Sequence, residues 1–169
     1  TYAKAMREIG NPTLGFNFFQ SIAAHLPQGV ELITLYHKNE VVGGGFVASF
    51  KHTVFCLWSG LLRDYYDLRT AYSLSWEAIK YANLNESCWV DLGRCRKGSG
   101  GFHFKKGFGG QIQQLYQQFY LNGIDQAPIV GAEMQEDVKY RVFVSMWRRL
   151  PQPVTEVLGP KLRKQMPFG

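Results

Sequence analysis

Two adjacent lysines set between aromatic residues are candidates for stabilising negative charge that develops in a reaction. Lys105 and Lys106 follow Phe104 and precede Phe108 within the stretch WVDLGRCRKGSGGFHFKKGFG. A cation beside an oxygen that gains negative charge stabilises the transition state. An ammonium held against an apolar wall is screened less than one in water. The alternative is that both lysines are surface residues ending a helical turn, where the helix dipole favours them.

A glycine-rich loop precedes these lysines and has the composition of an anion-binding turn. Consecutive glycines let backbone N–H groups point at a phosphate, and a helix that begins just after the loop would add its positive end. Nearby arginine and lysine side chains add positive charge. The residues that we assign to this candidate binding loop are Arg94, Lys97, Gly98, Ser99, Gly100 and Gly101. The alternative is an ordinary turn between a strand and a short helix.

Asp91 is the second candidate catalytic residue, because it lies at the end of a short predicted strand directly before this loop. A carboxylate there is suited to accept the proton of an attacking amine or to orient Arg94. The alternative is a structural carboxylate bonded to backbone amides. Tyr72 and Trp76 are candidate substrate-binding residues, since an aromatic cleft can stack on a sugar or a base; the alternative is that they belong to the core.

Hydrophobic periodicity and turn residues predict an α/β fold for the first two thirds of the chain. Helices are expected at residues 2–9, 16–26 and 70–83, with one helical turn at 102–106 that Ser99 caps and Gly107 ends; strands are expected at 30–37, 41–50, 53–57, 89–92 and 111–120. An antiparallel meander followed by a strand–helix–strand crossover makes a mixed, mostly antiparallel sheet with helices on both faces.

The character of the sequence changes after Gly123. We expect a linker over residues 124–137, an amphipathic helix over 140–150, and a tail over 151–169 that contains prolines and a basic run. The predicted division is therefore residues 1–122 as one domain and residues 123–169 as linker, amphipathic helix and basic tail. The helix and tail suit contact with an anionic membrane surface. The alternative is that the same apolar face packs onto the domain or onto a neighbour.

Composition excludes several classes of protein. The formal net charge is +6, which favours an anionic partner but does not select one. Three cysteines without a CxxC pair, and four histidines without an HxH or HExxH pattern, argue against a disulfide framework and a metal site. They favour a reducing compartment. No apolar run approaches the roughly 20 residues of a membrane span.

The stretch from Trp89 to Gly109 resembles a pattern found in FemAB-like proteins associated with exosortase systems, roughly "fDfGRs…gSGtyrFKk.wG". Upstream, YYDLRTAYSLSWEAIKYA resembles a helix of that family, and downstream KYRVFVSMWRRLPQPVTEVLGP resembles its C-terminal end. Three positions depart from the pattern: Thr70-Ala71 stands where the family carries Pro-Asn, Ser75 where relatives often carry Tyr, and Phe108 where they carry Trp.

The resemblance implies a GNAT fold, the fold of the acyl-CoA N-acyltransferases, whose element order the predicted elements follow. It implies an enzyme that moves an activated acyl or aminoacyl group to an amine acceptor in peptidoglycan or exopolysaccharide metabolism of the bacterial envelope. It selects Lys105, which matches the lysine of the family's Phe-Lys motif, as the oxyanion-stabilising residue. No permanently bound cofactor is implied; the donor co-substrate is acyl-CoA or aminoacyl-tRNA.

The resemblance also bears on partners. The partners that it implies are an anionic donor and an amine-bearing envelope precursor, and the expected location is the cytoplasm, either free or at the inner face of the cytoplasmic membrane. Family members carry a first GNAT-like domain, so this chain is expected to be a C-terminal half or a short relative.

Two other functions stay open from sequence. One is a catalytically degenerate GNAT-like module that binds a nucleotide sugar, a lipid-linked glycan or a partner protein. The usual GNAT pyrophosphate-loop pattern is missing before the helix expected at 70–83, where residues 63–69 contain no glycine. The other is RNA binding through the basic surface, for which no RNP, KH or zinc motif is present.

Overall fold

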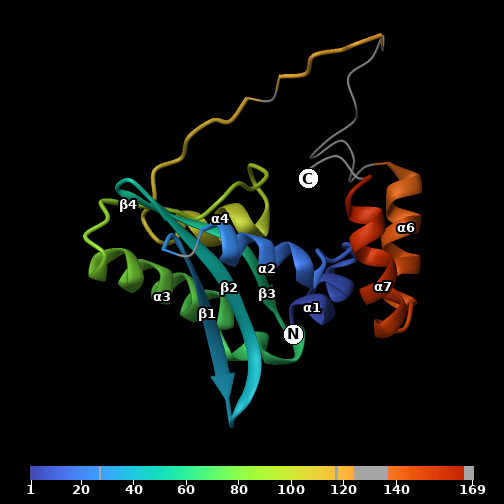
Figure 1. Cartoon of the computed structure of the whole chain (residues 1–169), viewed down its shortest axis with the longest axis horizontal. Coiled ribbons are helices and arrows are strands. Elements are labelled where there is room, and N and C mark those ends of the chain that lie inside the picture. Colours follow the sequence, from blue (N-terminus) through green and yellow to red (C-terminus); the bar gives the residue numbers. More distant parts are fainter. Residues whose placement is uncertain (27, 117, 124–136, 166–169) are drawn as a thin grey trace. The chain divides into compact units, whose positions relative to one another are not determined.

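The computed structural model of the chain describes residues 1–26, 28–116, 118–123 and 137–165. The elements follow the order α1 (Tyr2–Ile9), α2 (Phe16–His25), β1 (Val30–His37), β2 (Glu40–Phe50), β3 (Thr53–Leu61), the 3-10 helix η1 (Arg63–Leu68), α3 (Thr70–Leu84), β4 (Trp89–Asp91), α4 (Gly100–Lys106), α6 (Val138–Arg149) and α7 (Gln152–Arg163). The α/β class is confirmed, and every helix and strand predicted before residue 107 is present (Figure 1).

The described residues divide into two compact units. The first comprises Thr1–Gly93 with Val142–Gln165, and the second comprises the described residues between Arg94 and Arg141. The first unit contains the whole four-stranded sheet, and the second contains α4 and the candidate glycine loop. The structure therefore groups part of the C-terminal segment with the sheet domain.

The sheet has the order β1-β2-β3-β4. The first three strands form an antiparallel meander, and β4 adds to β3 in parallel after the α3 crossover. Tight turns make the two hairpins: Lys38 and Asn39 have φ of 47° and 67°, and Lys51 has φ of 53°. In the β1–β2 turn both central residues have positive φ, which gives a two-residue turn the twist that the flanking strands need.

Helices cover both faces of this sheet. On one face, Ala78 and Ala82 of α3 pack against Val47 and Val54 to form the buried core. On the other face, the ring of Phe19 in α2 stacks on Phe46 at 4.9 Å between centroids. In Figure 1, α2 and α3 accordingly lie on opposite sides of the strands. Helix α1 joins the α2 face, where Gly60 of β3 lets the backbone of Tyr2 come close: an added Cβ would lie 2.9 Å from the Tyr2 Cα.

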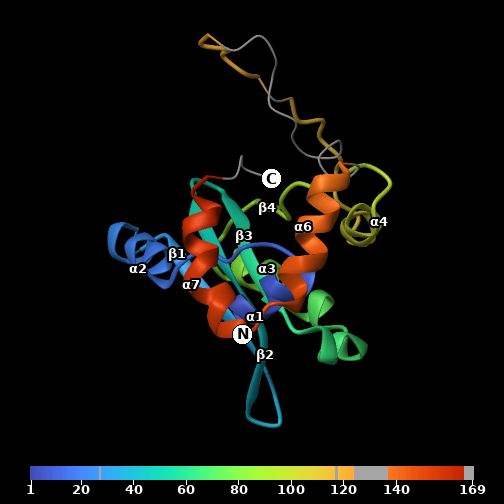
Figure 2. The same ribbon diagram turned by 90° about the vertical axis from the view of Figure 1, so that its right-hand side faces the viewer.

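The C-terminal helices secure α1. Arg7 donates to the carbonyl of Leu150 at 3.0 Å, and Arg148 donates to the carbonyl of Ile9 at 3.1 Å. Helix α7 approaches the segment after α1 so closely that a Cβ on Gly159 would lie 2.9 Å from the backbone nitrogen of Thr13. Figure 2 shows α1 between α6 and α7.

One prediction of secondary structure is wrong. The described part of residues 111–120 forms no strand, and its apolar side chains are largely exposed, Tyr116 at 84% and Tyr120 at 93%. Alternation of residue types does not make a strand without a neighbouring strand to take its backbone hydrogen bonds. The proline-containing tail, for which no element was predicted, forms helix α7 over Gln152–Arg163. The linker predicted over residues 124–137 lies, apart from Asp137, outside the described residues.

Candidate functional site

The residues predicted to form a site fall into both units, and each unit is described by itself. Asp91, Tyr72 and Trp76 belong to the sheet unit. The binding loop and the lysine motif belong to the second unit, which holds Arg94, Lys97, Gly98, Ser99, Gly100, Gly101, Phe104, Lys105 and Phe108.

In the second unit, Ser99 organises the glycine loop. Its hydroxyl accepts from the backbone N–H of Phe102 at 3.2 Å, which caps the first turn of α4, and donates to the carbonyl of Arg96 at 2.7 Å. This is the N-cap that the sequence predicts. Gly98 has φ of 76°, a conformation that favours glycine, and a Cβ on Gly98 or Gly100 would meet no atom within 4 Å. The loop is thus a closed turn with open space beside its glycines.

The side chain of Lys105 reaches back to the start of this loop. Its ammonium donates to the carbonyl oxygen of Arg94 at 3.0 Å, although the two residues are eleven positions apart. The side chain is half-buried, whereas that of Lys106 is exposed. Phe104 and Phe108 flank the lysines and contact each other edge to face, with centroids 5.4 Å apart. The structure therefore holds the Lys105 ammonium against the start of the loop.

Asp91 ends β4 and shapes the next turn. Its carboxylate accepts from the backbone N–H of Gly93 at 2.7 Å, and Gly93 has φ of 76°. This is the structural contact that the alternative interpretation of Asp91 predicts. The proposed role as a base for the amine stays a prediction.

Tyr72 and Trp76 lie one helical turn apart on the outer surface of α3. They are 47% and 56% exposed, so neither belongs to the core. The guanidinium carbon of Arg69 lies 6.0 Å from the centre of the Tyr72 ring, within reach of a cation–π contact. Exposed aromatic rings beside a cation suit stacking on a planar ligand, and this role stays a prediction.

Strand β4 covers only the first part of the edge of β3. Strand β4 pairs with β3 at only three positions, from Thr53↔Trp89 to Phe55↔Asp91, while β3 continues to Leu61. Among the described residues no strand follows β3 along that edge beyond Phe55. In α/β sheets, ligands bind at the carboxyl ends of strands where neighbouring connections diverge. Asp91 lies at the carboxyl end of β4, and a ligand-binding role at this end stays a prediction.

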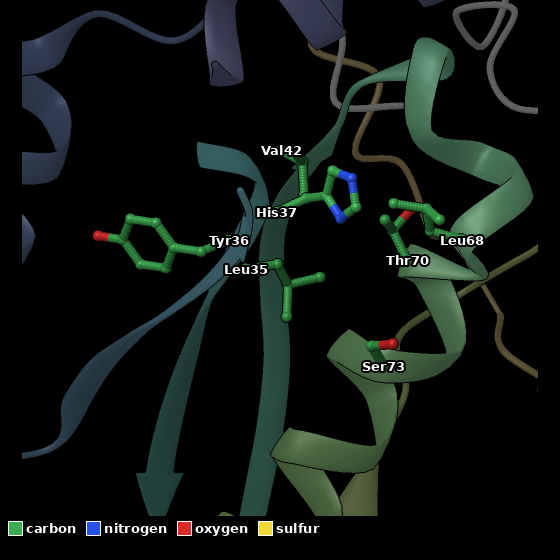
Figure 3. A pocket seen from close by; sticks show the side chains of 7 residues that line it. All are labelled: Leu35, Tyr36, His37, Val42, Leu68, Thr70 and Ser73. Atoms are coloured by element: carbon green, nitrogen blue, oxygen red, sulfur yellow. The ribbon is translucent and has the colours of Figure 1, made fainter. Parts of the chain in front are cut away.

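A pocket of about 290 Å³ lies at the start of α3, and the sequence did not reveal it. Its lining residues come from β1, β2, the end of η1 and the first turn of α3 (Figure 3): Leu35, Tyr36, His37, Val42, Leu68, Thr70 and Ser73. The His37 and Thr70 side chains extend from opposite walls toward each other. The N-terminal end of a helix carries partial positive charge. Nothing in the sequence indicates that the β1–β2 turn meets the start of α3, 33 residues later.

Thr70 is the unusual member of this pocket. The residue is 4% exposed, and its hydroxyl has no hydrogen-bond partner in the described structure. Nearby, the Tyr65 hydroxyl donates to the Glu40 carboxylate at 3.0 Å, and this hydrogen bond raises the pKa of Tyr65 above its ordinary value. The wall thus combines helix-end backbone, hydroxyl groups and an imidazole with an apolar floor.

Two solved structures share the fold at low sequence identity. The tetramutant of the BH1408 protein from Bacillus halodurans has a TM-score of 0.52 and 13% identity, over 65% of this chain and 76% of that one. A Pyrococcus furiosus protein named as a candidate acetyl transferase has a TM-score of 0.52 and 13% identity, over 71% of this chain and 91% of that one. No curated protein matches the chain.

The sequence matches the FemAB family over residues 17–123, which is more than half of the chain. The matched range includes the sheet, α3 and the Phe104-Lys105 motif, so it covers every predicted site residue. The GNAT fold expected from the resemblance is confirmed by the sheet topology and by the solved structures that share it. The chain therefore belongs to the FemAB family of GNAT-fold N-acyltransferases.

Proposed function

We propose that this chain transfers an activated acyl or aminoacyl group to an amine on a precursor of the bacterial cell envelope. The observation that carries the proposal is the FemAB family match over residues 17–123. The proposed donor is an acyl-CoA or an aminoacyl-tRNA, both of which present an anionic body and a reactive carbonyl. A basic chain with a net charge of +6 suits either donor.

The proposed chemistry is acyl transfer through a tetrahedral intermediate. The amine nitrogen forms a bond to the donor carbonyl carbon, and the carbonyl oxygen becomes negatively charged. Loss of the thiolate or tRNA hydroxyl as leaving group restores the carbonyl, and the amine proton passes to a base. Lys105 is proposed to stabilise the oxyanion and Asp91 to take the proton.

The contact between Lys105 and Arg94 supports the first of these roles. A lysine in water samples many rotamers, whereas a 3.0 Å bond to a carbonyl restricts the ammonium to a small region. A preorganised cation stabilises a developing charge without further ordering at the moment of reaction.

The test replaces Lys105 by alanine and compares it with the same change at its exposed neighbour Lys106. Loss of one oxyanion donor costs about 100-fold to 1,000-fold in turnover. We expect that loss for Lys105→Ala, and a change of less than about threefold for Lys106→Ala. Single-turnover acyl transfer from labelled acetyl-CoA and labelled aminoacyl-tRNA measures both. Equal turnover in the two variants would exclude the proposed role of Lys105.

A second candidate is a binding module that has lost catalysis. Both proposed catalytic side chains have structural bonds, Lys105 to Arg94 and Asp91 to Gly93, and this observation favours it. A melting-temperature panel with CoA, acyl-CoA, nucleotide sugars and tRNA separates the two candidates, because a ligand of the folded state raises the melting temperature. Stabilisation by a nucleotide sugar, with no transfer from any donor, would support the module.

A further inference from the structure

The net charge of the chain is concentrated in its C-terminal helices. The segment 138–165 contains seven basic residues, Lys139, Arg141, Arg148, Arg149, Lys161, Arg163 and Lys164, and one acidic residue, Glu156. Its net charge is therefore +6, which equals the net charge of the whole chain. The other residues of the chain balance, with twelve basic and twelve acidic side chains. Helices α6 and α7 thus carry the basic character of this protein.

Helix α6 also has two apolar faces. Its inner face buries Trp147, which is 3% exposed and stacks on Phe143 at 5.6 Å between centroids. Its outer face carries Val138, Val142 and Met146, spaced by four residues and 70%, 53% and 63% exposed. Residues spaced by four lie one above another on a helix. A helix that packs through one face needs no second apolar stripe, so the outer stripe indicates a further partner.

Helix α7 repeats this arrangement. Thr155 and Gly159 are buried on its inner side. Val154, Val157 and Leu158 are 38%, 63% and 41% exposed, and at 100° per residue they fall on the opposite side, around Lys161. Both helices lie toward the viewer in Figure 2. Each therefore offers exposed valine and leucine or methionine side chains next to basic groups.

We propose that the outer faces of α6 and α7 dock onto an anionic lipid bilayer. Helices that lie in a membrane interface combine an apolar face with lysine and arginine, and their binding energy comes from both. No helix among the described residues is both long and apolar enough to cross a membrane, so the contact is with the surface. A second copy of the chain is a poor occupant, because two segments of charge +6 would repel each other.

This inference stands whether or not the chain transfers acyl groups. It would place the protein beside substrates that are anchored in a membrane, and such an acceptor need not leave its bilayer. The docking proposal therefore concerns the location of the protein, whereas the proposed role of Lys105 concerns its reaction.

The experiment measures co-sedimentation of the full chain with vesicles of phosphatidylcholine alone and of phosphatidylcholine with one-third phosphatidylglycerol. Two double variants test the electrostatic and the apolar contributions to binding separately. Arg149→Glu with Lys161→Glu changes the charge, and Val142→Ser with Met146→Ser removes the apolar stripe. Each basic group near an anionic surface contributes about fivefold to binding, so the charge variant should bind at least about 25-fold more weakly. The matched control, Lys51→Glu with Lys80→Glu, makes the same charge change outside α6 and α7.

The expected result is binding to anionic vesicles only, weakened by added salt, lost in both test variants and kept in the control. Circular dichroism verifies that each variant is folded, and turnover of a water-soluble donor should be the same in the charge variant and the parent. The proposal is overturned if the parent does not bind anionic vesicles at low salt. It is equally overturned if the control loses as much binding as the charge variant, or if the apolar variant only abolishes self-association.

Discussion

Thr70 stands at the first position of α3 with its hydroxyl buried and unpartnered in the described structure. A buried hydroxyl without a hydrogen bond costs about 1–3 kcal/mol, since the group leaves its water partners behind. Folded proteins retain such groups mainly where another role requires them. Thr70 lines the wall of a pocket.

Replacing Thr70 by valine should therefore stabilise the protein by about 1 kcal/mol, because the variant removes the unsatisfied group and keeps the β-branched shape. Thr155 is the matched control: it is equally buried, but its hydroxyl donates to the carbonyl of Gln152 at 2.9 Å. Thr155→Val should lose about 1 kcal/mol. Urea unfolding of both variants measures the difference. The interpretation of Thr70 fails if the two substitutions shift the midpoint in the same direction.

At the residue scale, the sequence predicted local contacts well and distant ones poorly. The cap by Ser99 follows from a serine placed three residues before the first turn, and it is present. The bond from Lys105 to the Arg94 carbonyl depends on how the loop turns back, which no residue type encodes. The meeting of His37 and Thr70 in one pocket likewise needs the tertiary fold.

Among the elements, α7 shows why a proline-containing tail can be helical. Pro151 and Pro153 stand at or next to the helix start, where backbone N–H groups have no partner inside the helix. Pro160 lies inside the helix and destabilises it, because a proline removes one backbone hydrogen bond there. Packing on α1 and the segment after it offsets this cost, and packing is not visible in the local sequence. For this reason the sequence did not predict a helix in the tail.

Gly159 makes that packing specific. An added Cβ would lie 2.8 Å from the Thr13 Cγ2, 2.9 Å from its backbone nitrogen and 3.3 Å from its carbonyl oxygen. Backbone atoms cannot rotate away, so Gly159→Ala should cost about 2 kcal/mol of unfolding free energy. The control is Gly100→Ala, whose Cβ would meet nothing within 4 Å. It should keep or slightly raise stability. Thermal unfolding of both variants provides the measurement, and equal melting temperatures would contradict this account.

For the molecule as a whole, the C-terminal segment Val142–Gln165, which holds most of α6 and all of α7, groups with the sheet unit. Tyr2 of α1 is buried enough that its pKa is raised, and Arg163 of α7 lies close enough to oppose that shift. The side chains of Arg7 and Arg148 bond across the same contact. Stability of the first helix therefore depends on residues some 150 positions later.

A chain that stops after Leu150 should show this dependence. Without α7, the Thr13 segment and the α1 face lose their covering, and the loss should be on the order of 3 kcal/mol, a large part of the stability of a small domain. Denaturant unfolding, followed by tryptophan fluorescence, gives the value. An unchanged unfolding midpoint would mean that α7 is only an accessory to the sheet unit.

The contact of α1 and the Thr13 segment with α7 imposes an order on folding events during protein synthesis. The strands, α3 and their core involve neighbours close in the chain, so they can assemble while translation continues. Helix α1 is made before the sheet, yet its covering helix α7 is made after it, and the gap of about 150 residues delays its docking. Until the ribosome has delivered α7, a nascent chain would expose the surface around Gly10 and Thr13, which makes that surface a natural target for a chaperone.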